Sequence, residues 1–237
     1  RMAFLQEIKV DAEVLPQMRT LLEQIFPEYI CILRVNKTKY AGTGALIWKG
    51  DKDKVRVEFP EAPDARVMVI KFVSKGQRIA VINAYTVCGG TPTKDENRVH
   101  WDRALRQLIV GLRDEGYEVV LVGDLNVFLE EGDFTWDNRA GPAGIPGTTQ
   151  AEKEQAEVLL EGMVDVGPKA HTFRSYSYPR FSGRLDYVFS DKSIATRFSK
   201  AGTMEHQAHS ATLGPYDHKM IFVENDLWPD DEAAPEG

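Results

Sequence analysis

Five short polar clusters, each at the end of an apolar run, contain the residues of this sequence that could do chemistry. The clusters are Leu5-Gln6-Glu7, Asn83-Ala84-Tyr85, Gly123-Asp124-Leu125-Asn126, Arg184-Leu185-Asp186-Tyr187 and Asp217-His218. Together they offer carboxylate, amide, phenol and imidazole groups. Oxygen ligands of this kind suit Mg²⁺, and an activated water with donors for a developing charge is what cleavage of a phosphate ester requires. The clusters therefore predict a site at which a divalent cation and a water act on a phosphate ester.

The cluster Gly123–Asn126 is the strongest of the five. It follows the apolar run Val119–Val122, so a buried strand would deliver Asp124 and Asn126 to the same side of an extended chain. A carboxylate and an amide placed in this way can bind a metal ion or a water and steady a phosphate oxygen. The alternative is a plain turn after a strand, because Gly, Asp and Asn all favour turns.

Glu7 and Tyr85 each close an apolar run. Glu7 is expected to be a carboxylate ligand of the metal ion, although a single Glu at such a place is usually a surface residue. Tyr85 follows the run Ile79–Ala84, where a phenol could hydrogen-bond the phosphate or act as an acid near a metal ion. A lone Tyr in that position would more often pack in the core.

Asp217 and His218 stand in a loop just before the run Met220–Val223, and in a loop both side chains can converge on one point. His218 is suited to bind or protonate a phosphate oxygen, with a carboxylate to fix its tautomer. Asp186 is the expected orienting partner, by the logic that orients histidine in catalytic triads. An isolated histidine is more often structural.

Length and composition bound the class of protein. A chain of 237 residues with 43% hydrophobic and 27% charged residues is ordinary for a soluble α/β protein, and we expect one domain over residues 1–225 and an acidic tail over residues 226–237. No apolar run is long enough to cross a membrane, and no signal peptide is recognisable. Two cysteines, Cys31 and Cys88, are too few for a disulfide framework or a zinc site, which favours an intracellular, reducing compartment.

Charge is unevenly distributed along the chain. The net charge of −7 would argue against a nucleic-acid partner, but residues 226–237 contain acids and no Lys or Arg. Basic residues outnumber acidic ones between residues 162 and 200, where Arg174, Arg180 and Arg184 lie. A basic face beside a metal site is what binding of a phosphate backbone requires; a merely solvated surface is the alternative.

Strand-like and helix-like segments alternate. Asp95–Glu115 and Thr148–Leu160 have apolar residues at helical spacing, and Asp11–Ile25 is a third amphipathic segment that contains Pro16. The expected strands are Met2–Gln6, Ala45–Trp48, Val55–Phe59, Val67–Phe72, Ile79–Ala84, Val119–Val122, Leu185–Phe189 and Met220–Val223. Many strands with a few long helices between them indicate two packed sheets flanked by helices.

With its clusters in this order, the chain resembles the endonuclease/exonuclease/phosphatase superfamily, and within it the exonuclease III-like apurinic/apyrimidinic endonucleases. Leu5–Lys9 is similar to the Leu-Gln-Glu-Thr-Lys motif of that branch, and Gly123–Val127 matches Gly-Asp-Leu-Asn-Val. Arg184–Tyr187 matches Arg-Leu-Asp-Tyr, and Tyr216-Asp217-His218 stands where the branch has Ser-Asp-His. The resemblance implies an α/β fold, a four-layer sandwich of two packed, mostly antiparallel sheets flanked by helices.

The resemblance also implies a role for each site residue. Asp124 would activate water, Asn126 would support the transition state, Tyr85 would contact the phosphate, and His218 would pair with Asp186. The cofactor would be Mg²⁺, with Mn²⁺ as a substitute. The candidate metal-site residues are Glu7, Asp124, Asn126, Asp217 and His218.

The implied partner is DNA, with RNA as the alternative, and no membrane. Its backbone would be held by Arg174, Arg180 and Arg184, beside the apolar side chains of Phe173 and Leu185. The branch begins with a strand and a helix upstream of the Glu motif. Both are absent from this sequence, so we expect either that a partner chain or another segment completes that side of the sheet, or that the sequence is a piece of a longer protein.

Two replacements bear on specificity. Cys88 stands where the branch has a second Asn, which removes a phosphate contact. Gly183 replaces the Trp that lines the pocket for a flipped abasic sugar. Both affect the expectation of abasic specificity more than that of phosphodiester cleavage.

The function that the resemblance implies is Mg²⁺-dependent incision of DNA 5′ to abasic sites, as in base excision repair. A retrotransposon-type or general endonuclease, or a phosphatase of the same superfamily, is the first alternative, and Gly183 favours it. A catalytically silent, nuclease-like subunit of a nucleoprotein assembly is the second. The intact polar clusters count against a silent subunit, because a scaffold has no need of them.

Overall fold

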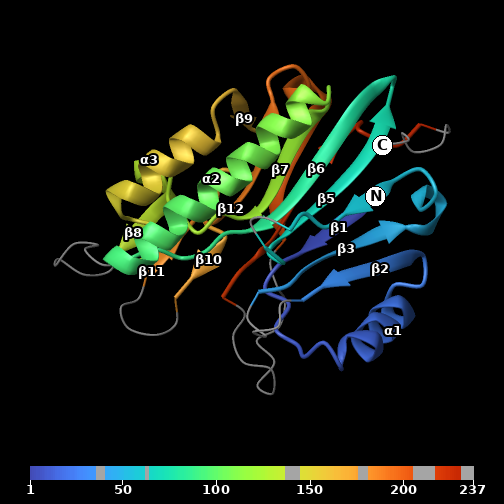
Figure 1. Ribbon diagram of the computed structural model, residues 1–237, viewed down its shortest axis with the longest axis horizontal. Helices are drawn as coiled ribbons and strands as arrows, with labels where there is room; N and C mark the ends of the chain where they lie inside the picture. Colours follow the sequence, from blue (N-terminus) through green and yellow to red (C-terminus); the bar gives the residue numbers. More distant parts are fainter. Residues whose placement is uncertain (36–40, 62–63, 137–144, 176–180, 205–216, 231–237) are drawn as a thin grey trace. The chain divides into compact units, whose positions relative to one another are not determined.

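The computed structural model describes residues 1–35, 41–61, 64–136, 145–175, 181–204 and 217–230 (Figure 1). Over these residues the protein is a mixed α/β structure with several sheets and three α-helices. Two compact units form, each from segments that are not contiguous in the sequence. Unit 1 is Arg1–Tyr85, Ala104–Asp124 and Asp226–Gly237, and unit 2 is Thr86–Arg103 and Leu125–Asn225. The single domain predicted over residues 1–225 stays a prediction.

An antiparallel sheet with the strand order β1-β3-β2 opens unit 1. Its strands are β1 (Met2–Leu5), β2 (Tyr29–Arg34) and β3 (Thr43–Trp48). Helix α1 (Leu15–Ile25) packs on β2 (Figure 1), around the buried side chains of Ile8, Cys31 and Leu33. Pro16 lies in the first turn of α1, where its missing N–H is not needed, so the helix begins there instead of breaking.

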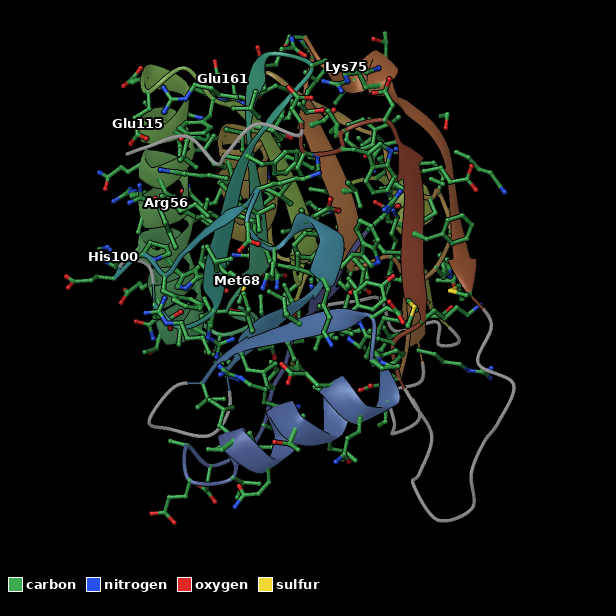
Figure 2. All side chains as sticks on the ribbon, turned by 90° about the vertical axis from the view of Figure 1, so that its right-hand side faces the viewer. Arg56, Met68, Lys75, His100, Glu115 and Glu161 are labelled. Atoms are coloured by element: carbon green, nitrogen blue, oxygen red, sulfur yellow. The ribbon has the colours of Figure 1, made fainter. Side chains whose placement is uncertain are left out.

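Four further strands of unit 1 are neighbours in the order β4-β5-β6-β7. They are β4 (Arg56–Glu58), β5 (Val67–Ser74), β6 (Gln77–Tyr85) and β7 (Glu118–Asp124). Lys75 and Gly76 join β5 to β6 with positive φ angles of 53° and 74°, as a tight two-residue hairpin requires. Figure 2 shows Lys75 at this turn and Met68 near the other end of β5. Because β6 and β7 are parallel, their carboxyl ends meet at one edge of the sheet, away from the Lys75 turn.

The acidic tail predicted from residue 226 onward is anchored over its described part. The Asp230 carboxylate accepts hydrogen bonds from the backbone N–H groups of Lys75 (2.7 Å) and Gly76 (3.0 Å). The Asp230 N–H donates to the carbonyl of Val73 at 2.8 Å. Residues 226–230 therefore belong to unit 1, whereas residues 231–237 lie outside the described residues.

Helix α2 (Pro92–Asp114) is the connection between parallel strands β6 and β7. Leu105, Ile109 and Leu112 are buried at helical spacing, as the sequence predicts. Gly116 follows with a φ of 82°, a left-handed conformation that suits glycine and ends the helix. No helix over the described residues is long and apolar enough to span a membrane.

Over the described residues, unit 2 contains one helix of its own, two small sheets and the strand pair β9–β12. Helix α3 (Gln150–Leu159) starts at Thr149, whose side chain accepts from the N–H of Glu152, while Glu152 accepts from the N–H of Thr149. Strand β9 (Met163–Asp165) pairs with β12 (Asp186–Asp191). Strand β11 (Phe181–Gly183) pairs on one side with β10 (Phe173–Arg174) and on the other with β8 (Phe134–Trp136). Strand β13 (Phe198–Met204) pairs with β14 (Met220–Asn225).

Candidate active site

In unit 1, the carboxylate of Glu7 is held by a phenol and an ammonium. The Tyr85 hydroxyl donates to Glu7 Oε1, and the Lys9 ammonium lies 2.7 Å from Glu7 Oε2. Glu7 follows β1 with a φ of 53°, in the left-handed region that side-chain-bearing residues seldom adopt. Backbone strain of this kind persists where the surroundings fix it, and it clusters at functional sites.

Two amides join β1 to β6 next to this pair. Gln6 Nε2 donates to Asn83 Oδ1 at 2.7 Å, and Asn83 Nδ2 donates to the carbonyls of Leu5 (3.1 Å) and Gly44 (3.0 Å). Asn83 is 0% exposed, so these bonds satisfy an amide whose burial would otherwise be unfavourable. They fix the end of β1, and hence Glu7, against the end of β6 that carries Tyr85.

Tyr85 and Asp124 are opposite residues at the carboxyl ends of β6 and β7. Side chains of opposite residues on neighbouring strands emerge on the same face of a sheet, so Asp124 lies on the same side as the Tyr85–Glu7 pair. Asp124 is 4% exposed. A Cβ on the preceding Gly123 would come 1.9 Å from the carbonyl oxygen of Ala84, which explains the glycine of this cluster.

A basic side chain, Arg66, contacts Tyr85. Its guanidinium lies 4.7 Å from the centroid of the Tyr85 ring, and its carbonyl accepts the Tyr85 N–H at 2.9 Å. Asp64 pairs with the same guanidinium at 3.7 Å. Arg66 orients the phenol and brings positive charge next to it. Sequence reasoning missed Arg66 because the residue stands alone in a turn, with no motif around it.

In unit 2, Asn126 is clamped by the segment 86–88. Its Nδ2 donates to the carbonyl of Thr86 at 3.0 Å, and its Oδ1 accepts from the Cys88 thiol at 3.2 Å. Its own carbonyl accepts from Arg98 at 3.2 Å. Asn126 has a φ of 47°, so the chain has left the extended conformation and the two-residue alternation expected from the sequence no longer holds.

The structure brings Asp186 and His218 together. His218 Nδ1 lies 2.9 Å from Asp186 Oδ2, an arrangement in which the carboxylate holds a proton on Nδ1. Thr172 supports the turn beside the carboxylate, because its buried hydroxyl accepts the N–H groups of Leu185 and Asp186, each at 3.1 Å. Phe173 pairs with His218 in an isolated bridge, with their ring centroids 4.9 Å apart. The carbonyl of the exposed Asp217 accepts from Arg174 N–H at 2.8 Å.

The residues expected to hold a nucleic-acid backbone fall in different environments. Arg174 is exposed on β10, and Arg180 lies outside the described residues. Arg184 is 1% exposed, and its guanidinium makes two bonds to the Asp165 carboxylate, at 2.6 and 2.8 Å. This burial contradicts the predicted backbone contact of Arg184, which instead joins the segment between β11 and β12 to Asp165 at the end of β9. Leu185 is buried and Phe173 partly buried.

Gly183, where the resemblance leads one to expect Trp, is covered by Phe128. A Cβ at residue 183 would come 2.2 Å from the Phe128 ring and 2.7 Å from the carbonyl oxygen of Asp133. Phe128 is buried and lies 4.8 Å from Phe134 and 6.3 Å from Phe181, between ring centroids. An aromatic ring is therefore present at this place, but residue 128 supplies it.

The donors present fit a divalent cation. Mg²⁺ takes one or two carboxylates as ligands and keeps several waters. Unit 1 offers two carboxylates near the carboxyl ends of β6 and β7, those of Glu7 and Asp124. Over the residues that the structure describes, no three His, Cys, Asp or Glu side chains are gathered into a ready-made metal centre. Asp217 and His218, also expected near the metal ion, belong to unit 2.

Comparison with known proteins identifies one family. The model of the Endonuclease/Exonuclease/phosphatase family matches residues 2–211. Among curated protein sequences, none is significantly similar to the chain.

Solved structures of similar fold include a 3′ phosphatase from Neisseria bound to a product DNA hairpin, with a TM-score of 0.75 and 19% identity over 94% of this chain and 88% of that one. An AP endonuclease from Archaeoglobus fulgidus has a TM-score of 0.72 and 20% identity, over 95% of this chain and 89% of that one. An AP endonuclease from Leishmania major has a TM-score of 0.68 and 17% identity, over 94% of this chain and 87% of that one. At these identities the likeness shows the fold alone, and it confirms the predicted α/β sandwich.

Proposed function

The chain belongs to the endonuclease/exonuclease/phosphatase family and is a phosphodiester-hydrolysing enzyme, and from this premise we propose that it is a Mg²⁺-dependent endonuclease that incises DNA 5′ to abasic sites. The observation that carries the proposal is the gathering of Glu7, Tyr85 and Asp124 at the carboxyl ends of β6 and β7. The likeness to AP endonucleases and to a phosphatase bound to a DNA hairpin supports DNA as the substrate.

In the proposed reaction, Asp124 takes a proton from a water whose oxygen attacks phosphorus. The bond from phosphorus to the 3′ oxygen breaks and that oxygen takes a proton from solvent water, which leaves a 3′-hydroxyl and a 5′-phosphate. Glu7 would be a ligand of the metal ion, which when bound offsets charge on the leaving oxygen. Tyr85 contacts the phosphate, while Asn126 and His218 stabilise the charge that develops around phosphorus.

Asp186 acts through His218 in this scheme. A carboxylate on Nδ1 sets the tautomer of the ring and presents Nε2 to a phosphate oxygen. Selectivity for abasic sites would arise because a nucleotide without a base loses little stacking when it leaves the helix. We propose that Arg174, which is exposed, contacts the phosphate backbone of the DNA.

A second candidate function is phosphodiester or 3′-phosphate cleavage without preference for a lesion. The packing of Phe128 on Gly183 favours it, because the wall expected for an abasic sugar is built differently in this chain. In either case we propose an intracellular, reducing compartment, since Cys31 and Cys88 form no disulfide in the described structure.

Three labelled substrates tested side by side separate these functions: a duplex with one abasic analogue, an undamaged duplex and a duplex with a 3′-phosphate end. Each is incubated with Mg²⁺ or with EDTA. Asp124→Ala should abolish cleavage, whereas Asp53→Ala, a carboxylate exposed on the surface of unit 1, should cleave like the wild type. Incision confined to the abasic duplex supports the first proposal, and equal cutting of the undamaged duplex supports the second. No cleavage of any substrate by folded protein with Mg²⁺ would reject both.

A further inference from the structure

Arg98, on the first half of α2, is a fully buried cation that contacts the backbone of Val87 and Asn126. One guanidinium nitrogen, Nη1, donates to the carbonyls of Val87 (3.1 Å) and Asn126 (3.2 Å). Its Nε donates to the carboxylate of Asp102, one helical turn later, at 2.7 Å. The side chains of Arg98 and Asp102 are both only 1% exposed.

Stabilisation of the fold does not explain the ion pair of Arg98 and Asp102 well. Arg98 Nη2 and Asp102 Oδ1 find no hydrogen-bond partner among the described residues, so each charge is buried with part of its bonding capacity unused. Burial raises the pKa of the Asp102 carboxyl, and Arg98 only partly opposes that rise. Apolar side chains of similar volume often replace a buried ion pair without loss of stability. The contacts that an apolar pair could not make are the two carbonyl contacts.

Those two carbonyls belong to the segments that set the amide of Asn126. The segment 86–88 holds Asn126 through the carbonyl of Thr86 and the thiol of Cys88, and Arg98 joins the middle of that segment to the Asn126 backbone. These contacts hold Asn126 at a φ of 47°, a left-handed conformation that asparagine adopts more readily than most other residues with a side chain.

The same segment is fixed from its other end by Glu152, at the start of α3. This buried carboxylate accepts from the N–H groups of Gly89 (2.9 Å) and Gly147 (2.8 Å) and from the Thr149 hydroxyl (2.8 Å). Glu152 thus serves the cap of α3 and the loop together, whereas the carbonyl contacts of Arg98 are directed at the Asn126 side. Arg98 is therefore the residue whose substitution isolates the support of Asn126.

We propose that Arg98 is a positioning residue of the active site, which fixes Asn126 against the segment 86–88 so that its amide is oriented before the substrate binds. The inference rests on the proposed function, because it assigns Arg98 to the residue that we expect to stabilise the transition state. It needs no contact between Arg98 and the substrate. If Arg98 acts in this way, the effect of substituting it on the cleavage rate should depend on whether Asn126 is present.

The test is a double-mutant cycle on Mg²⁺-dependent cleavage of the abasic duplex. Arg98→Lys keeps the charge beside Asp102 but loses the fork that reaches both carbonyls. Arg98→Met with Asp102→Ala removes the ion pair and remains testable if the lysine variant does not fold. Asn126→Ala and Asn126→Ala with Arg98→Lys complete the cycle. The matched control is Arg78→Lys, because Arg78 donates to the carbonyl of Glu115 at 2.7 Å and lies at the opposite end of β6 from Tyr85.

We expect Arg98→Lys to lower kcat by about 10- to 100-fold, since small misplacement of a catalytic group is costly, and to leave KM within about threefold. In the Asn126→Ala background the same substitution should cost no more than about twofold. Arg78→Lys should leave kcat unchanged. A merely structural Arg98 would lower the melting temperature and slow both backgrounds equally.

Two results overturn the inference. One is an Arg98 variant that folds and retains the wild-type kcat, and the other is a loss of equal size with and without Asn126. Failure of the proposed function is separable, because in that case the wild type would not cleave the abasic duplex, or Asp124→Ala and Asn126→Ala would themselves leave its cleavage unchanged. If both of those variants are impaired while Arg98→Lys is fully active, only the role of Arg98 is refuted.

Discussion

The hydroxyl of Tyr85, at the end of β6, donates a hydrogen bond to the carboxylate of Glu7, which stands 78 residues earlier at the end of β1. This contact joins two sheets of unit 1 at the edge where Asp124 emerges. The carboxylate that we propose as a metal ligand and the phenol that we propose as a phosphate contact are thus joined by one bond, so Tyr85 orients Glu7.

Removal of that hydroxyl should therefore impair the site without unfolding the protein. Tyr85→Phe is expected to lower kcat on the abasic duplex by about 10- to 100-fold, the range found when a residue that orients a metal ligand is changed. The Mg²⁺ concentration needed for half-maximal rate should rise as well. Tyr29→Phe, on β2, is the control and should cleave normally. Wild-type rate and metal dependence in Tyr85→Phe would show that the bond to Glu7 has no functional part.

The pair of Asp186 and His218 leads to a second prediction. Asp186→Asn keeps the size of the side chain but no longer favours a proton on Nδ1, so the ring presents the wrong tautomer. We expect kcat to fall by about 100-fold or more in single-turnover cleavage. Asp114→Asn, at the exposed end of α2, serves as the control. If Asp186→Asn cleaves at the wild-type rate, His218 does not depend on its carboxylate partner.

Asp165 and Arg184 give a prediction about stability and pH. Burial alone would raise the pKa of Asp165, but the hydrogen bonds from Arg184 and Lys169 outweigh it and hold that pKa below its ordinary value. A lowered carboxyl pKa adds stability above the unfolded pKa of about 3.9, and this contribution is lost as pH falls through the folded pKa.

Urea unfolding of the wild type and of Asp165→Asn at pH 7 and at pH 3 measures this contribution. At pH 7 the variant should be less stable by about 3 kcal/mol, since it leaves the Arg184 guanidinium buried without its partner. The difference in free energy of unfolding between the two proteins should be smaller at pH 3, because below a pKa of about 3.9 the unfolded wild type binds a proton on Asp165 that the folded protein binds less readily. A gap that is equal at both pH values would contradict the predicted linkage.

The packing of Phe128 on Gly183 predicts a rescue. Gly183→Ala should destabilise the protein by about 1–3 kcal/mol, because the new methyl group meets the Phe128 ring and the carbonyl of Asp133. Adding Phe128→Ala should make the glycine substitution less costly than it is in the wild-type background. Melting temperatures of the four proteins in this cycle provide the measurement. Equal costs in both backgrounds would show that the ring does not limit residue 183.

Regular elements were predictable from the sequence where local pattern decides them. The helix predicted over Asp95–Glu115 is α2, and the run Val119–Val122 is the interior of β7, because their apolar spacing agrees with their burial. The strands β2 and β13 were missed. So were β8 to β11, which have two or three residues each and depend on their neighbours for pairing.

Side-chain environments were harder to predict. The basic stretch between residues 162 and 200 predicts an exposed Arg184, but in the structure Arg184 is buried in unit 2 and paired with Asp165, 19 residues earlier. No local signal distinguishes Arg66 or Arg98 from surface arginines, since the Tyr85 ring that Arg66 contacts and the Asn126 carbonyl that Arg98 contacts are brought to them by the fold. The cluster motifs identified the reactive groups, while the residues that position them emerged only from long-range contacts.

The most direct test of the central claim is single-turnover cleavage of a duplex with one abasic analogue, mapped at nucleotide resolution. We expect a single cut 5′ to the lesion that leaves a 3′-hydroxyl, requires Mg²⁺, stops with EDTA and is lost in Asp124→Asn. Folded Asp124→Asn that cuts at the wild-type rate, or wild-type cleavage that is unaffected by EDTA, would contradict the account.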